Sequence, residues 1–200
     1  MKIDLHCHTK KTKTCEKESR NVTIELFKEK VEEAEVKMVG ITNHNYFNKD
    51  EYLSFRDSVK DNCYVLPGIE LDVEGNLEKT KGHIILIADP NQVDLFNDKL
   101  VAILKNIKPD DFCINSHALY ETFKDMDIIY IAHFLKDKQL SEADLEDLKS
   151  IMKYPLRLLK EAANIVSIGV LQSNNHRAMI GSDVVNWSEY EKYSFAELKF

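Results

Sequence analysis

Two histidines near the start of the chain have the spacing of metal ligands. His6 and His8 end a stretch, beginning at Met1, in which apolar and polar residues alternate. Because successive side chains of a β-strand point to opposite faces, an extended segment places both imidazoles on one face, with Asp4 below them. Two imidazoles on one face can bind one metal ion, although the same pair would also suit an exposed edge strand. The rest of the sequence has to decide between these interpretations.

Further side chains of metal-ligand type lie where apolar runs of the sequence end. In four such runs the last residue is a histidine or an acid: His44 ends 38–44, Glu70 ends 64–70, His133 ends 128–133 and Asp183 ends 178–183. His83 is the exception, because it lies near the start of its run, 82–87. Helical stretches alternate with these runs, which predicts parallel β/α units whose strands bring their carboxyl ends to one face. Imidazoles and carboxylates gathered there predict a polynuclear site suited to Zn²⁺, Mn²⁺ or Fe²⁺.

The order of these motifs resembles the PHP (polymerase and histidinol phosphatase) family. The motifs H-x-H, T-N-H-N, P-G-I-E, G-H, A-H and G-S-D run from residue 4 to residue 183. The resemblance implies an α/β fold, a distorted (βα)7 TIM-like barrel (the PHP fold), whose strand ends hold up to three metals and which mostly hydrolyses phosphoesters. Residues 3–13 and 41–45 are most similar to PHP domains at the N-terminus of SMC-like ATPase proteins. We therefore expect one barrel domain over residues 1–200, either complete or the first part of a longer protein with a fused or partner ATPase domain.

By this resemblance six residues would bind two cations. His6, His8, Glu70 and Asp183 would hold the first, and Glu70 would bridge to a second held by His83 and His133. The family's third position is matched here only by His44, because no Asp or His stands five or six residues after His8 and Val185 replaces the family's last histidine. We therefore predict a dinuclear centre with the third position empty or weak. Cys15 or Glu16 could substitute if their loop turns inward, and His176 could do so from the barrel rim.

Such a centre is suited to the hydrolysis of phosphoesters. Two close cations lower the pKa of a shared water, and the resulting hydroxide attacks phosphorus while the cations neutralise its non-bridging oxygens. The catalytic candidates are His44, Glu70 and Asp183. His44 would act as a partial ligand or would hydrogen-bond the substrate or a bound water.

A cluster of cations after His8 is the candidate binding site for the phosphate. It comprises Lys10, Lys11, Lys13, Lys17 and Arg20, with the first three as the substrate-binding candidates, joined by Arg177 late in the chain. In a chain with a net charge of −7, a local basic patch beside the metals would focus an anionic substrate. A nucleotide, another phosphorylated small molecule or a nucleic acid fits that description, although a solvated run of charges would have the same composition.

Two other functions are compatible with the same residues. The first is a degenerate, metal-stabilised module that serves a neighbouring ATPase domain as a structural or regulatory part, which the two replaced third-position ligands favour. The second is hydrolysis of an amide or a ring on the same centre, because an activated hydroxide can also attack carbon.

Composition predicts one cytoplasmic domain. The 200 residues, 44% of them apolar, suffice for a substantial core. The four cysteines form no C-x-x-C pair, which favours reduced thiols, and no apolar run has the length of a signal peptide or a membrane span. We therefore expect a soluble protein that does not bind membranes.

Periodicity predicts helices over 23–35, 94–105 and 141–152, and a further helix that starts at Pro155. We interpret His117 as an ordinary polar residue at a helix start, and Asp72 and Glu74 as solvated loop acids.

Overall fold

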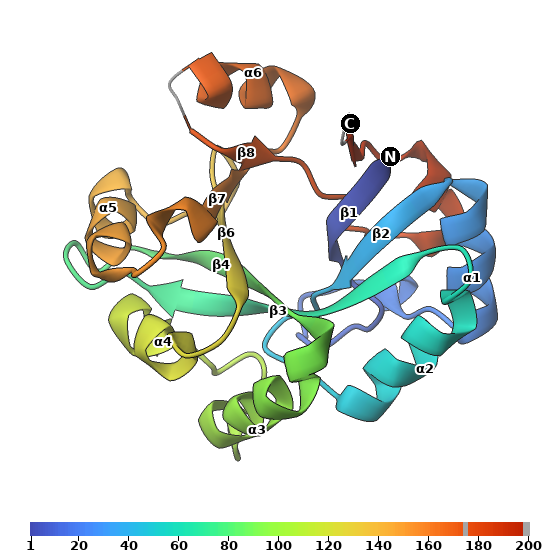
Figure 1. Ribbon diagram of the computed structural model, residues 1–200, viewed down its shortest axis with the longest axis horizontal. Helices are drawn as coiled ribbons and strands as arrows, with labels where there is room; N and C mark the ends of the chain where they lie inside the picture. The colour runs from blue at the N-terminus through green and yellow to red at the C-terminus, as the bar shows by residue number, and fades with distance from the viewer. Residues whose placement is uncertain (174–175, 198–200) are drawn as a thin grey trace.

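A strongly curved mixed sheet forms the body of the molecule, and helices cover its outer face (Figure 1). The computed structural model describes residues 1–173 and 176–197. Neighbouring strands follow the order β8-β7-β6-β4-β3-β2-β1-β9, and β5 pairs with β3 outside this path. The sheet nearly closes on itself, which confirms the predicted α/β barrel-like fold.

The elements have the following bounds. The strands are β1 (Lys2–Cys7), β2 (Val36–Ile41), β3 (Tyr64–Glu74), β4 (Lys81–Ala88), β5 (Ile114–Asn115), β6 (Ile128–His133), β7 (Leu158–Glu161), β8 (Ala178–Met179) and β9 (Ala196–Glu197). The α-helices are α1 (Ile24–Glu33), α2 (Lys49–Val59), α3 (Val93–Leu104), α4 (Ser116–Phe123), α5 (Glu142–Ile151) and α6 (Ile165–Ser173). Short 3-10 helices are η1 (Glu18–Arg20), η2 (Pro90–Gln92), η3 (Pro155–Arg157) and η4 (Trp187–Lys192). In the described part of the chain, no helix combines the length and apolar character that crossing a bilayer requires.

Strand β4 runs against both of its neighbours, which differs from the expected succession of parallel units, and the short β9 also pairs antiparallel with β1. β4 pairs antiparallel with both β3 and β6, whereas β1, β2 and β3 pair in parallel, as do β6, β7 and β8. A reversed strand presents its amino end at the edge where parallel strands present their carboxyl ends. This reversal explains why His83 lies near the start of its strand while the other candidate ligands follow the ends of theirs.

Three of the predicted helices are present, and two of them begin at a residue whose side chain caps the helix. The Thr23 side chain accepts a hydrogen bond from the N–H of Leu26 at the start of α1, and Ser141 accepts from the N–H of Asp144 at the start of α5. The helix over 94–105 is α3. Pro155, in contrast, starts only the turn η3, and the chain then enters β7.

The helix that starts at Pro155 is limited to the three residues of η3, because pairing within the sheet outweighs local preference in the residues that follow. Residues of β7 pair in parallel with β6, in a register that joins Tyr130 to Leu158 and His133 to Glu161. The apolar run that follows forms α6, which leaves Ile165 and Val166 largely exposed.

The inside of the barrel is apolar below the candidate site. A small cluster of side chains fills it: Leu5, Ile85, Ile87, Ile131 and Met179. Two larger clusters pack outside the sheet, one under α3, α4 and α5 and the other under α1, α2 and η4. The polar residues of the site therefore pack on a layer of apolar side chains, which keeps water from approaching them from below.

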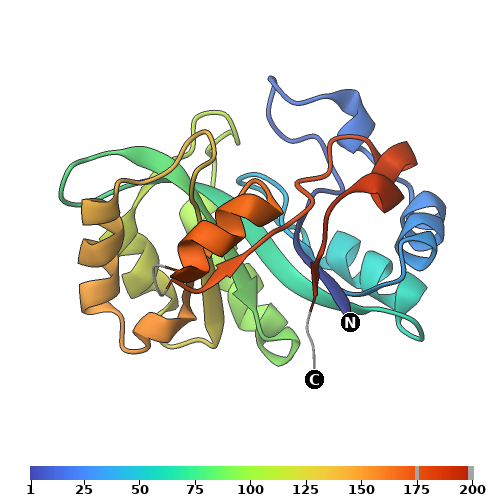
Figure 2. The same ribbon diagram turned by 90° about the horizontal axis from the view of Figure 1, so that it is seen from above.

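The seam between β8 and β1 is closed by hydrogen bonds to Asp4. This buried carboxylate accepts from the N–H of Ser182 at 2.9 Å and from the hydroxyl of Tyr190 at 2.7 Å. The N–H of Asp183 donates to the carbonyl of His6 at 2.8 Å, and β9 lies along β1 near the amino terminus (Figure 2). Asp4 therefore joins the end of the barrel to its beginning.

Candidate metal centre

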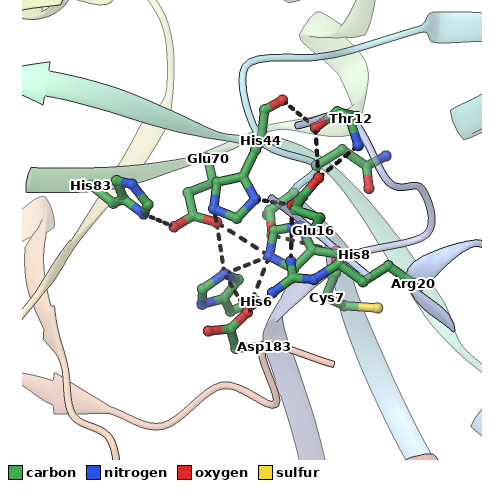
Figure 3. A network of polar contacts seen from close by, with 12 residues as sticks. His6, Cys7, His8, Thr12, Glu16, Arg20, His44, Glu70, His83 and Asp183 are labelled. Carbon is green, nitrogen blue, oxygen red and sulfur yellow. Dashed lines mark hydrogen bonds and ion pairs between the residues drawn. The ribbon is translucent and has the colours of Figure 1, made fainter. Parts of the chain in front are cut away.

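Buried imidazoles and carboxylates converge at one end of the barrel (Figure 3). His6 and His8 point the same way from β1, and their Nε2 atoms lie 2.9 Å apart. The Asp183 Oδ1 atom lies 3.8 Å from Nε2 of His6 and 3.4 Å from Nε2 of His8. Ligand atoms of these three residues all lie within 4.8 Å of one another, as one cation would require.

The sequence around Asp183 shows why it reaches this position. A Cβ at Gly181 would overlap the Cβ of His6, so only glycine lets the chain pass so close to β1. The short turn then places the Asp183 carboxylate beside the imidazoles, with about a third of the side chain exposed.

Glu70 lies at the centre of the cluster, and its two oxygens face different partners. Oε2 is 3.0 Å from Nε2 of His6 and 2.7 Å from Nε2 of His44. Oε1 is 2.5 Å from Nδ1 of His83 and 3.2 Å from Nε2 of His133. A fully buried carboxylate placed between two sets of imidazoles has the arrangement of a bridging ligand.

The loop after β1 turns inward and brings a carboxylate beside His44. Oε1 of Glu16 lies 2.5 Å from Nδ1 of His44, and Glu16, His44 and His8 form a further group of close donors. Cys15 is exposed instead. Of the substitutes that the sequence allowed, the structure therefore places Glu16 among the donors.

The loop stabilises Glu16 as an anion. Burial raises the pKa of its carboxyl, but hydrogen bonds from His44 and from the backbone N–H groups of Lys13 and Thr12 outweigh burial and hold the pKa at about 2. The side chain is thus a charged ligand candidate at neutral pH.

Glu161 is a member of the cluster that sequence reasoning missed. Its Oε1 accepts a hydrogen bond from Nδ1 of His6 at 2.8 Å, and its Oε2 lies 3.2 Å from Nε2 of His133 and 3.1 Å from Nζ of Lys136. The residue ends β7, a strand that the sequence analysis did not predict. An acid after the short apolar run Leu158–Leu159 is the one signal that could have found it.

Asp72 also belongs to the site, which corrects its interpretation as a solvated loop acid. β3 continues to Glu74, so alternation puts Asp72 on the same face as Glu70. Its Oδ1 lies 2.8 Å from Nε2 of His83, and its Oδ2 pairs with Lys13. Burial raises the pKa of Asp72, but its contacts with His83 and Lys13 outweigh burial and lower the pKa well below its usual value.

The protonation states fit a site for divalent cations. Burial lowers the pKa of His8 and of His133, which favours the neutral imidazoles that bind metals. Burial opposes the charge of Glu70, but the neighbouring His6 and His44 lower its pKa well below the usual value. Nδ1 of His133 and Nδ1 of His8 are buried without a hydrogen-bond partner, and Nε2 of His133 lies 3.2 Å from an oxygen of Glu70 and from an oxygen of Glu161. Neutral imidazoles with free nitrogens beside ionised carboxylates form a donor set that accepts Zn²⁺, Mn²⁺ or Fe²⁺.

His6 differs from these two imidazoles. Burial lowers its pKa, but the charges of Glu161, Glu70 and Asp183 raise the pKa well above the usual value. A proton and a divalent cation therefore compete for this ring, and cation binding releases the proton.

The predicted cationic residues divide into two groups. Lys10, Lys11 and Arg177 do not line the cavity that opens above the cluster. Lys10 pairs with Glu51 and Lys11 pairs with Glu18, whereas Arg177 lines two other hollows of the barrel surface. Lys13 lines the cavity.

The two remaining histidines lie away from the cluster. The ring of His176 is tilted against that of Phe134, with 6.2 Å between the ring centroids, and its Nε2 lies 3.5 Å from Nζ of Lys160. His117 follows the cap residue Asn115 at the start of α4 and pairs with Asp147, as expected of a polar helix residue.

A cavity of about 620 Å³ opens above the cluster. Its walls carry both ligand candidates and cations, and among the described residues the charged ones are Lys13, Glu16, Lys17, Arg20, Glu70, Lys136, Asp137, Lys138 and Asp183. A volume of this size can enclose a small-molecule ligand.

Comparison with known proteins identifies the fold. No protein-family model and no curated protein matches the sequence. Among solved structures, one similar chain is a protein assigned as a metal-dependent phosphoesterase from Bifidobacterium adolescentis, with a TM-score of 0.58, 13% identity, and coverage of 98% of this chain and 91% of that one. PsfC from Pseudomonas syringae is also similar, with a TM-score of 0.56, 14% identity, and coverage of 93% and 77%. The chain therefore has the barrel fold of these two proteins.

Proposed function

We propose that the protein is a metal-dependent phosphoesterase. The observation that carries this proposal is Glu70, whose two oxygens face two separate sets of buried imidazoles. The resemblance of the strand-end motifs to the PHP family and the fold shared with a protein assigned as a metal-dependent phosphoesterase support the same reaction.

Six side chains are the proposed ligands of two cations: His6, His8, Glu70, His83, His133 and Asp183. Bound divalent cations supply Lewis acidity, which lowers the pKa of water and neutralises phosphate oxygens. Asp183 is partly exposed toward the cavity, so it meets substrate as well as cation. His44 lies between Glu70 and Glu16, where it can bind a cation or hydrogen-bond a phosphate oxygen.

We further propose that Glu16 completes a third donor set with His8 and His44. The sequence predicted this position empty or weak because the family's own ligands are replaced. The inward turn of the loop supports a weaker third cation, since Glu16 is close to both imidazoles but also shares its charge with Arg20.

Nucleotides or the ends of nucleic acids remain the predicted substrates, and the cytoplasm the predicted location. The acids of the cluster are balanced by cations of the cavity wall, which supports an anionic substrate. Whether an ATPase domain accompanies this chain also stays a prediction.

The test is hydrolysis by metal-free protein to which one cation at a time is returned. With Mn²⁺, Zn²⁺ or Fe²⁺ we expect turnover of p-nitrophenyl phosphate and of a panel of nucleotides and oligonucleotides. Glu70→Gln should reduce kcat/KM by more than about 100-fold, because a bridging ligand supports both cations. Glu121→Gln, an exposed acid paired with Lys124 on α4, is the matched control and should retain full activity.

Two outcomes would contradict the proposal. Protein that binds the cations, gains thermal stability and hydrolyses none of the esters would be the structural module considered above. Protein that cleaves amides but no phosphoester would use the same centre for attack on carbon.

A further inference from the structure

Two positively charged side chains contact Asp183, each through a different carboxylate oxygen. The Arg20 guanidinium lies 2.9 Å from Oδ1 of Asp183, and Nζ of Lys136 lies 3.6 Å from Oδ2. Arg20 ends η1 and Lys136 follows β6, so distant segments of the chain supply them. Both side chains line the cavity above the donor cluster.

Both side chains are nearly buried, which charged side chains tolerate only when they have charged or polar partners. The Arg20 side chain is 10% exposed and that of Lys136 is 14% exposed. One Arg20 nitrogen, Nη1, is buried and makes no hydrogen bond with the described residues, and its ion-pair partner, Oε1 of Glu16, lies 3.4 Å away. A buried donor of this kind, beside a cavity, indicates a ligand with acceptor oxygens.

The partners of these cations are themselves ligand candidates. Arg20 contacts Asp183 and Glu16, and Lys136 contacts Asp183 and Glu161. When divalent cations share the charge of these carboxylates, the attraction between each carboxylate and its Arg or Lys weakens. The guanidinium and the ammonium then have hydrogen-bond donors to offer to an anion in the cavity.

The charge of the whole cavity favours an anion of more than one negative charge. Among the described residues, five cationic and four acidic side chains line it. Two divalent cations would make this balance strongly positive, and low-dielectric walls would focus the resulting field.

We propose that Arg20 and Lys136 select the dianionic terminal phosphate of a phosphomonoester over an internal phosphodiester. A terminal phosphate offers three free oxygens and about two charges above its second pKa of about 6, whereas a diester offers two free oxygens and one charge. Two metals and two side-chain cations therefore have more partners on the monoester. The inference rests on the proposed phosphoesterase function and names its substrate class.

The reaction selected in this way is simple hydrolysis. An oxygen of water forms a bond to phosphorus as the ester P–O bond breaks, and the products are inorganic phosphate and an alcohol. The proton lost by the attacking water is balanced by the proton that the leaving alkoxide gains.

The activity test compares p-nitrophenyl phosphate with bis(p-nitrophenyl) phosphate at pH 8 in the Mn²⁺-loaded protein. We expect kcat/KM to favour the monoester by about tenfold or more. In Lys136→Gln and in Arg20→Gln, kcat/KM for the monoester should fall by about tenfold or more, because each variant loses a charge-assisted hydrogen bond to the phosphate. In the same variants, kcat/KM for the diester should change by less than about threefold. Lys136→Arg should retain the preference, and Lys124→Gln, an exposed lysine of the Glu121 pair, is the control.

A binding test reports on the same sites without turnover. Calorimetry of the Mn²⁺-loaded protein should show orthophosphate binding about tenfold or more tighter than dimethyl phosphate, and Lys136→Gln should remove most of the difference while metal content stays constant. Equal or preferred cleavage of the diester would overturn this inference and leave the phosphoesterase function intact. Failure to hydrolyse either ester would overturn both, and equal binding of the two anions would overturn the selectivity alone.

Discussion

At the scale of single residues, Glu161 fixes the orientation of the His6 ring and therefore the direction of its Nε2 atom. Because Glu161 holds Nδ1 at 2.8 Å, Nε2 of His6 points toward Glu70, His8 and Asp183. Carboxylates that orient a ligating imidazole in this way also raise its basicity. In the proposed centre, Glu161 would therefore support cation binding without touching the cation.

We expect Glu161→Gln to weaken cation binding by about 10- to 100-fold with the fold retained. The amide keeps the shape of the side chain but loses the charge that faces His6 and Lys136. Competition with a chromophoric chelator measures the affinity, and Glu146→Gln, an exposed acid paired with Lys149, is the control. An unchanged dissociation constant would show that His6 does not depend on Glu161.

In the proposed centre, Glu16 would decide whether a third cation binds. If it completes the third donor set, Glu16→Ala should lower the metal content of the saturated protein by about one ion per chain while the tighter ions remain. Elemental analysis after dialysis measures this content. Glu18→Ala, in the same loop and paired with Lys11 on the surface, should have no effect. Equal content in both variants would argue for a dinuclear centre with no role for Glu16.

How well the sequence predicted each residue depends on what positions it. His6 and His8 need only strand alternation, which is local, so the sequence suffices to place them on one face. The position of Asp72 depends on where β3 ends, and the position of Glu161 depends on whether β7 forms. Both properties come from pairing between strands, so single-sequence reasoning misplaced Asp72 and missed Glu161.

At the scale of elements, the hairpin of β3 and β4 carries three members of the site, and Asp144 of α5 fixes its turn. The carboxylate accepts from the N–H groups of Leu77, Glu78 and Thr80 and from the Thr80 hydroxyl. Burial raises the pKa of this carboxyl, but the hydroxyl of Thr80 and the backbone donors outweigh burial and hold the pKa at about 2.

Asp144→Asn should destabilise the protein by about 1 to 2 kcal/mol at pH 7, because a charged acceptor of several hydrogen bonds is lost. The folded-state pKa is lower than the unfolded value, so this stabilisation is complete above about pH 4 and is lost as the pH falls toward 2. Urea unfolding of both proteins at a series of pH values measures the difference. A difference that is the same at pH 3 and pH 7 would contradict the proposed role of the charge.

The elements themselves were predicted unequally. Helices α1 and α5 carry capping residues, Thr23 and Ser141, and their starts were predicted within a residue. The direction of β4 has no local signal, because antiparallel and parallel strands have similar composition. The position of His83 near the start of its apolar run was nevertheless a sign in the sequence that this strand is reversed.

At the scale of the whole molecule, the ligand candidates tie together segments from residue 6 to residue 183. Cations bound to them stabilise only the folded chain. At a free Mn²⁺ concentration of 1,000 times the dissociation constant, one site adds about 4 kcal/mol, which corresponds to about 8 to 16 °C in Tm for a chain of this length.

We therefore expect Tm to rise by about this amount when Mn²⁺ is added to metal-free protein, and to fall again with excess chelator. Calorimetry or fluorescence scans measure Tm. The Glu70→Gln variant should lose most of the increase, because both cations lose a ligand, whereas Glu121→Gln should show the full increase. A Tm that is independent of Mn²⁺ in the unmodified protein would mean that the buried donors do not bind the ion.

The most direct measurement is an anomalous difference map from crystals grown with Mn²⁺. We expect two strong peaks within the cluster, one beside His6, His8 and Asp183 and the other beside His83 and His133, with Glu70 between them. A weaker third peak should lie beside Glu16 and His44. Crystals of active protein with no peak among these side chains, or with the cation bound elsewhere, would contradict the central claim that this cluster is the metal centre.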